Sequence, residues 1–173
     1  MVEETVAAFG ALHILVNNAA IARFGTLEQT SEADLDAMVD VDLKGPMYLI
    51  RAALPHLRKH KDSGGAAVLN ISSSVTSLAV KNFAVYSSVK AGLDQLTKCL
   101  ALDYGPEQIR VNAILPGVVE TPIFETMLPK AALGRAMASM AKLHPLGRVG
   151  RPEEIAEMAL YLCGPQAGFI TGA

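Results

Sequence analysis

Short apolar runs alternate along the chain with longer segments that mix apolar and polar residues. The runs at 12–20, 64–74 and 110–117 each end in asparagine, serine or proline-glycine. Short, nearly continuous apolar runs are typical of strands buried on both faces of a parallel sheet. The last residues, "FITGA", predict the beginning of a fourth strand.

Helix signals occupy the segments between these runs. The predicted helices cover residues 3–9, 31–59, 84–104 and a segment that begins at Pro152. Glycine closes the first at Gly10, and serine with an acid three residues later resembles a capping box at Ser31. Residues 118–148 predict irregular chain with one short helix. Strands that alternate with long helices predict an α/β protein with a parallel sheet.

Composition limits the classes of function. A chain of 173 residues with 51% hydrophobic residues is expected to form one domain with a substantial core. The net charge of -2, without a basic stripe or an acidic tail, argues against nucleic acid and membrane surfaces as partners. Cys99 and Cys163 lie in apolar helical patterns, so we expect buried free thiols and a cytoplasmic protein without a signal peptide or a membrane span.

Polar residues follow each predicted strand. Asn17-Asn18, Ser72–Ser74 and Pro116-Gly117 come at the ends of the three runs. The carboxyl ends of parallel strands share one edge of the sheet, where open α/β folds bind ligands. These residues therefore predict a binding site at that edge.

Tyr86 and Lys90 lie one helical turn apart near the start of the predicted helix 84–104. A phenol has a pKa near 10, and a neighbouring ammonium lowers it toward the range useful for proton transfer. Ser73, at the end of the preceding strand, is placed to donate a hydrogen bond to the same substrate oxygen. The alternative is an exposed tyrosine beside a solvated lysine, with a serine that only caps a turn.

Several motifs then occur in a fixed order. They read "ILVNNAA", "VDVDLKG", "NISSS" followed by "YSSVK", "RVNAILPGVVETP" and "GRPEEIAEMALYLCG". On these motifs the sequence resembles the classical short-chain dehydrogenase/reductase family along essentially its whole length. The resemblance implies a Rossmann-like α/β fold, with a doubly wound parallel sheet covered by helices on both faces. It also implies that residues about 118–148 form a lid-like substrate segment.

The resemblance implies a role for each matching position. Tyr86 would be the acid–base, Lys90 would lower its pKa and bind the nicotinamide ribose, and Ser73 would orient the substrate oxygen. The positions implied to contact the cofactor, NAD or NADP, are Asn17, Asn18, Ala19, Tyr86, Lys90, Pro116, Gly117, Val119 and Thr121. The implied activity is hydride transfer between a carbonyl and a secondary alcohol, with a small-molecule substrate.

Two positions depart from the family pattern. Asp42 stands where the family usually has its active-site asparagine, whose backbone carbonyl holds a water in a proton relay to the lysine. The resemblance implies that the Asp42 carbonyl could keep this relay, while its extra charge would pair with Lys90 and weaken the effect of Lys90 on Tyr86. We expect reduced or altered activity as a result. Ala20 replaces the glycine of the asparagine motif, which would matter if that backbone required a positive φ.

A larger departure is the lack of a glycine-rich turn after a first strand, where the family receives the pyrophosphate. Gly64-Gly65 precedes a strand instead of following one. We therefore expect residues 1–173 to be a partial dinucleotide-binding domain, truncated before its first strands and before the end of its last strand. Strand 12–18 would then be an exposed edge that is prone to aggregation.

Further interpretations remain open at this stage. Met127, Met137 and Met140 would line a substrate pocket or pack the lid onto the core. His56 and His60 are one turn apart, but the neighbouring Arg58, Lys59 and Lys61 favour a solvated basic face over a metal site. The helices 31–59 and 84–104 would form a homodimer or homotetramer. The competing function is a catalytically inactive chain that binds full-length relatives through the same helices.

Overall fold

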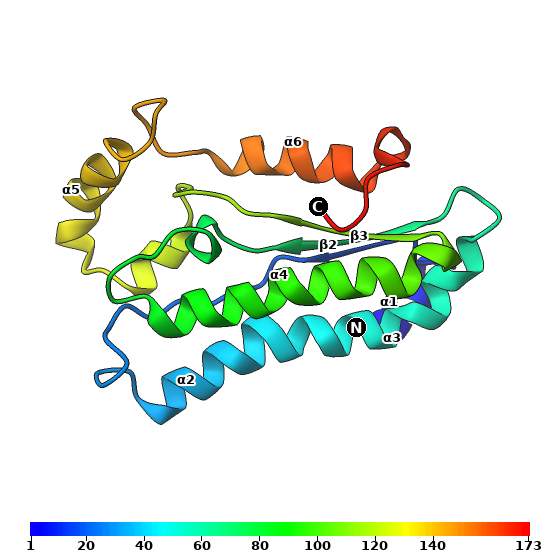
Figure 1. Cartoon of the computed structure of the whole chain (residues 1–173), viewed down its shortest axis with the longest axis horizontal. Helices are drawn as coiled ribbons and strands as arrows, with labels where there is room; N and C mark the ends of the chain where they lie inside the picture. Colours follow the sequence, from blue (N-terminus) through cyan, green and yellow to red (C-terminus); the bar gives the residue numbers. More distant parts are fainter.

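A computed structural model describes all 173 residues, and its centre is a parallel sheet of three strands in the order β1-β2-β3 (Figure 1). The strands are β1 (Ile14–Asn17), β2 (Ala66–Ile71) and β3 (Ile109–Ile114). In the register, Asn17 is opposite Asn70 and Asn70 is opposite Ala113. Parallel pairing confirms the strand prediction, and it brings the three carboxyl ends to one edge of the sheet.

Helices cover both faces of the sheet (Figure 1). One face carries α3 (Gly45–Leu57) and α4 (Ala84–Tyr104), with α1 (Val2–Phe9) packed against α3; the other face carries α6 (Pro152–Cys163). The main core lies between the strands β2 and β3 and the helices α3 and α4. Its residues Leu57, Val68 and Val111 are almost inaccessible to solvent. The structure thereby confirms the Rossmann-like α/β class with a parallel sheet.

Local signals set most helix boundaries. Gly10 ends α1 in the left-handed conformation at φ 80°, which glycine adopts at little cost. The Ser31 hydroxyl accepts from the Asp34 N–H at the start of α2 (Glu32–Val39). Pro152 opens α6, and α4 spans the predicted residues 84–104.

The predicted helix 31–59 is helical but not uniform. A π-helical turn, Asp40–Lys44, separates α2 from α3, and a 3₁₀ turn, Arg58–His60, follows α3. Such π turns insert an extra residue into the helix and are frequent at functional sites. Asp42 lies within this turn and is completely buried.

Strand β1 differs from the prediction in its burial. Ile14 is 44% exposed and Val16 is 45% exposed, so burial on both faces is wrong for this strand. Because β1 pairs only with β2 and α6 packs on β2 and β3, one face of β1 has no cover. The expectation of an exposed edge strand is confirmed.

The C-terminal "FITGA" does not form a fourth strand. Gly172 N–H donates to the Val111 carbonyl at 2.8 Å, and Ala113 N–H donates to the Ala173 carbonyl at 2.7 Å. The segment therefore runs beside β3 through hydrogen bonds to its backbone, while the 3₁₀ turn Pro165–Ala167 bends the chain before it.

Residues 118–148 contain more helix than predicted. A 3₁₀ turn, Pro122–Thr126, precedes α5 (Lys130–Ala141), which has no buried residue. This segment lies at the end of the molecule where the strands terminate (Figure 1). Met127 packs near Tyr86, which favours the packing role for that methionine.

Three smaller expectations can be compared with the structure. Both cysteines are free, but Cys99 is exposed and Cys163 is only half-buried, so their predicted burial is wrong. The His56 side chain is largely shielded from solvent and contacts Glu3. The ring of His60 stacks on that of His13. His56 and His60 therefore do not share a solvated face. No helix combines the length and the hydropathy needed to cross a bilayer.

Candidate active site

The end of β2 and the start of α4 place Ser73 beside Tyr86. After Ile71 the chain passes Ser72 and Ser73 and enters a short 3₁₀ turn. Ser73 lies near enough to the Tyr86 phenol to act on its pKa, in the lowering direction. The Ser73 oxygen also accepts from the Val75 N–H at 3.4 Å. Ser73 therefore caps a turn and lies near the phenol, so the two sequence interpretations are compatible.

Tyr86 is a buried phenol, with only 8% of its surface exposed. It packs with Ala22 and Met38, and the Phe83 ring meets it edge-on at 5.7 Å between centroids. The pKa of Tyr86 is raised to about 12, mainly by burial and next by the negative charge of Asp42, while Ser73 opposes the rise. The expected lowering of this pKa is not found, and Lys90 is not among the causes of its shift.

Lys90 is almost completely enclosed, at 1% exposure. Its Nζ donates to the Ile71 carbonyl at 3.0 Å, at the end of β2. The same Nζ lies 5.8 Å from the centre of the Tyr86 ring, a cation–π distance. Burial lowers the pKa of Lys90, while the carboxylates of Asp42 and Asp94 oppose that fall.

Asp42 is the buried carboxylate of the site. Its Oδ1 accepts from the Ile21 N–H at 2.9 Å, and its Oδ2 lies 3.8 Å from the Lys90 Nζ. That separation makes an ion pair but is too long for a hydrogen bond, and Oδ2 has no other partner. Burial raises the pKa of Asp42, and the Lys90 charge opposes the rise. The expected Asp42–Lys90 pairing is confirmed.

The residues expected to contact a cofactor divide into two groups. Asn17 is buried, and its Nδ2 donates to Asn70 Oδ1 at 2.8 Å, so its side chain links β1 to β2. The others lie at the strand ends with partly or fully accessible surfaces: Asn18, Ala19, Pro116, Gly117, Val119 and Thr121. Ala20 does not have a positive φ, so alanine causes no backbone strain there.

Sequence reasoning missed a line of buried polar groups that supports the site. Asn70 Nδ2 donates to Thr97 Oγ1 at 2.8 Å, and the Thr97 hydroxyl donates to the Leu93 carbonyl at 2.9 Å. With the Asn17 contact, this line crosses from β1 through β2 to α4. Asn70 interrupts the apolar run of β2 in the sequence, and that interruption was the available signal.

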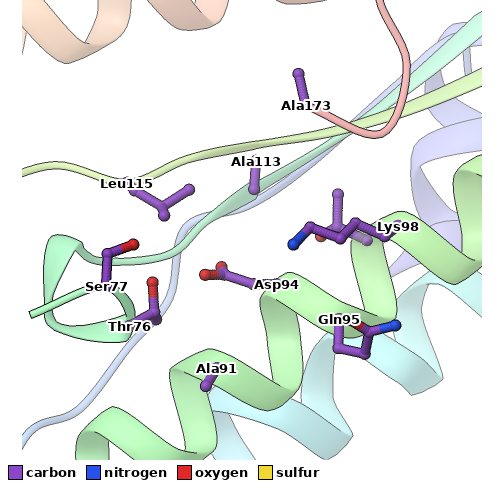
Figure 2. Close-up of a pocket in the computed structure, with 10 residues that line it drawn as sticks. Thr76, Ser77, Ala91, Asp94, Gln95, Lys98, Ala113, Leu115 and Ala173 are labelled. Atoms are coloured by element: carbon purple, nitrogen blue, oxygen red, sulfur yellow. The ribbon is translucent and has the colours of Figure 1, made fainter.

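A cavity of about 310 Å³ lies between α4, the turn after β2, β3 and the C-terminal residue. Its lining residues are Thr76, Ser77, Ala91, Asp94, Gln95, Thr97, Lys98, Ala113, Leu115 and Ala173 (Figure 2). None of the residues predicted for the site lines this cavity, so its size does not make it the reaction site. No group of three or more histidine, cysteine or acidic side chains is arranged to hold a metal ion.

The comparisons with known proteins agree with this geometry. A family model described as "Enoyl-(Acyl carrier protein) reductase" matches residues 1–173. An uncharacterised oxidoreductase of Thermotoga maritima is 37% identical over all of this chain and 68% of its own length. A cyclohexanol dehydrogenase of an Acinetobacter strain is 34% identical over 99% of this chain and 64% of its own length. The chain belongs to the short-chain dehydrogenase/reductase family.

A solved member of the short-chain dehydrogenase/reductase family has a closely similar fold. The crystal structure of 3-ketoacyl-(acyl-carrier-protein) reductase from Brucella melitensis, complexed with NADH, superposes with a TM-score of 0.89 at 32% identity. The alignment covers 99% of this chain and 67% of that one. The chain thus spans about two thirds of the length of the relatives it matches.

Proposed function

We propose that this chain is the catalytic part of an NAD(P)-dependent oxidoreductase that interconverts a carbonyl and a secondary alcohol. The observation that supports this most is the buried Tyr86 phenol with the Lys90 Nζ 5.8 Å from its ring centre and paired with Asp42. Ser73 lies near the same phenol. A hydroxyl, a phenol and an ammonium within one small region suit proton transfer to a carbonyl oxygen.

The residues at the strand ends suit the nicotinamide half of such a cofactor. The side chains of Asn18 and Thr121 offer donors for a carboxamide or for ribose hydroxyls, and Lys90 has N–H donors beyond the one used by Ile71. None of the strand-to-helix connections in residues 1–173 is glycine-rich, so we assign no pyrophosphate contact to them. The choice between NAD and NADP is left undetermined.

When bound, the nicotinamide cofactor would supply the hydride for the carbonyl carbon. Ser73 donates a hydrogen bond to the carbonyl oxygen and orients it toward Tyr86. As the carbonyl C=O becomes a single C–O bond, negative charge develops on the oxygen. The Tyr86 hydroxyl donates its proton to that oxygen, which yields the alcohol. The phenolate that remains lies near the Lys90 ammonium, whose Nζ is 5.8 Å from the centre of the Tyr86 ring.

A pKa of about 12 keeps Tyr86 protonated at neutral pH. The side chain is then ready to act as an acid, which favours carbonyl reduction. Alcohol oxidation requires the phenolate as a base, so its rate is expected to rise with pH until Tyr86 titrates. Residues 118–148 would lie over the substrate as a lid, because they occupy the same end of the molecule (Figure 1).

The proposal includes a homodimer or homotetramer formed through the helical segments 31–59 and 84–104. Tyr48 on α3 and Leu102 on α4 are large side chains that leave 56% and 80% of their surfaces exposed on these helices. Size-exclusion chromatography of Tyr48→Lys and Leu102→Lys tests this part: both should shift the chain to a smaller species.

Tyr86→Phe tests the proposed function directly. The purified chain should reduce cyclic ketones and 3-ketoacyl thioesters with NADH or NADPH, and the variant should lose at least about a hundredfold in kcat/KM, because general acid catalysis is removed. Tyr161→Phe, which removes an exposed phenol on α6, is the matched control and should keep full activity.

A wild-type chain that neither binds NADH or NADPH nor turns over, but forms a stable complex with a full-length relative, would support the competing role of an inactive binding partner.

A further inference from the structure

The imidazole of His144 connects two segments that meet at the substrate end of the molecule. Its Nδ1 lies 2.8 Å from the Met140 carbonyl, near the end of α5. Its Nε2 accepts from the Val118 N–H at 3.1 Å, in the turn that follows β3. A carbonyl can only accept, so Nδ1 carries the hydrogen and the unprotonated Nε2 is the acceptor.

Gly117 leaves room for this ring. A Cβ at position 117 would come within 2.8 Å of the His144 Nε2, shorter than any ordinary carbon contact. The backbone of Gly117 is not in the left-handed region, so its own conformation does not require glycine. The close approach of His144 is therefore the reason for glycine at this position.

The turn is held from its other side as well. The Val118 carbonyl accepts from the Gly150 N–H at 2.8 Å, and the Glu120 N–H donates to the Gly150 carbonyl at 2.9 Å. Both backbone polar groups of Val118 are therefore hydrogen-bonded, its N–H to His144 and its carbonyl to Gly150. By contrast, α5 buries no residue, so it has little apolar packing to position it.

We infer that His144 is a positioning residue that joins α5 to the turn 116–119, so that the substrate segment and the cofactor turn move as one unit. This inference rests on the proposed function, which assigns the turn to the nicotinamide end and residues 118–148 to the lid. In this inference His144 acts through its contacts with Val118 and Met140.

Hydrogen exchange tests the connection without requiring catalysis. His144→Ala should speed exchange of the Val118 amide and of the α5 amides at least about tenfold, because the acceptor is lost. His144→Gln, whose amide both donates and accepts, should restore protection. His13→Ala removes an imidazole at the opposite end of the strands and should leave these amides unchanged. Equal exchange in His144→Ala and wild type, or loosening of Val118 without α5, would overturn the inference.

A double-mutant cycle tests the contact with Gly117. Gly117→Ala should lower the thermal midpoint in the wild type and have little effect in the His144→Ala background, since the clash is then absent. Additive effects of the two substitutions would show that another cause requires glycine and would count against the inference.

Kinetics supply the functional readout in the active chain. His144→Ala should raise KM for both cofactor and substrate more than it lowers kcat, and His144→Gln should reverse the rise. Unchanged KM values, with hydrogen exchange altered as expected, would overturn the positioning role. A wild-type chain without turnover would contradict the proposed function, and the exchange results and the cycle would still decide whether the connection exists.

Discussion

At the scale of single residues, burial controls the chemistry of the site. Tyr86, Lys90 and Asp42 are all shielded from solvent, and desolvation is the largest influence on the pKa of each. The Asp42 carboxylate partly neutralises Lys90 and at the same time opposes formation of a Tyr86 phenolate. One acidic residue in place of an amide therefore favours the protonated form of the Tyr86 phenol.

Asp42→Asn is expected to lower the pKa of Tyr86 from about 12, because it removes the second-largest cause of the increase. The phenolate fraction at neutral pH rises about tenfold for each pKa unit of that fall. Ultraviolet titration of the tyrosines, with Tyr86→Phe as the blank, should show the change, and the pH–rate profile for alcohol oxidation should move to lower pH.

Asp40→Asn is the control for that substitution, since Asp40 lies in the same π-helical turn but is exposed and pairs with Lys44. It should leave the tyrosine titration unchanged. An unaltered activity and pH profile in Asp42→Asn would refute the role given to the carboxylate.

At the scale of elements, polar contacts join strands and helices near the site. The line Asn17–Asn70–Thr97 crosses two strands and reaches α4 two turns after Lys90. Buried polar groups are costly unless each donor has an acceptor, so this line specifies how α4 sits on the sheet.

Thr97→Val should destabilise the chain by about 1–3 kcal/mol, because it leaves the Asn70 amide without its acceptor in a buried position. Urea unfolding measures the change. Ser88→Ala removes a hydroxyl that donates to the Ala84 carbonyl on the exposed side of the same helix, and it should cost much less. Equal stabilities of the two variants would contradict the prediction.

The start of α6 carries a pH-dependent contact. Glu154 contacts Arg148 in a bidentate pair at 2.5 and 2.7 Å and accepts from the Arg151 N–H at 2.8 Å. The Arg148 side-chain bond is the main cause that lowers the pKa of Glu154 to about 2. A lowered pKa stabilises the folded state above the ordinary value of 4.5, and that contribution is lost as pH falls toward 2.

Glu154→Gln should therefore lower the thermal midpoint at neutral pH, and its difference from the wild type should shrink as pH falls from 4.5 toward 2. The effect is small because the pair is exposed. Glu157→Gln on the same helix removes no ion pair and serves as the control. A difference that stays constant over this pH range would argue against the assignment.

At the scale of the whole molecule, the sheet has an uncovered edge at β1. The strand pairs on one side only, and Ile14 and Val16 remain substantially exposed. Unpaired strand edges with apolar side chains promote association between molecules. The chain is therefore expected to aggregate through this edge at high concentration.

Val16→Lys should reduce light scattering on heating and at high concentration, because a charge on an edge strand opposes strand addition. Val80→Lys is the matched control, since Val80 is 44% exposed against 45% for Val16 but lies in a loop. An equal effect of the two substitutions would show that added charge alone, and not the edge, is responsible.

Much of the fold could be predicted from local signals. Ser31, Gly10 and Pro152 mark helix ends through interactions within a few residues, so those boundaries were found. The π-helical turn Asp40–Lys44 was missed because apolar periodicity continues through it. The exposure of β1 was misjudged because an apolar run is the same whether or not a neighbour covers it.

The sequence alone determined the order of strands and helices, the alignment of the strand ends, and the spacing that puts Tyr86 and Lys90 on one face of α4. These follow from periodicity and from chain geometry over short distances. Only the tertiary structure decided which groups of the site are protonated and which distant residues contact them. The buried Asp42–Lys90 pair and the His144 contact with Val118 are two examples. Solvent exclusion and contacts between residues distant in the chain set those properties, and neither is contained in a local pattern.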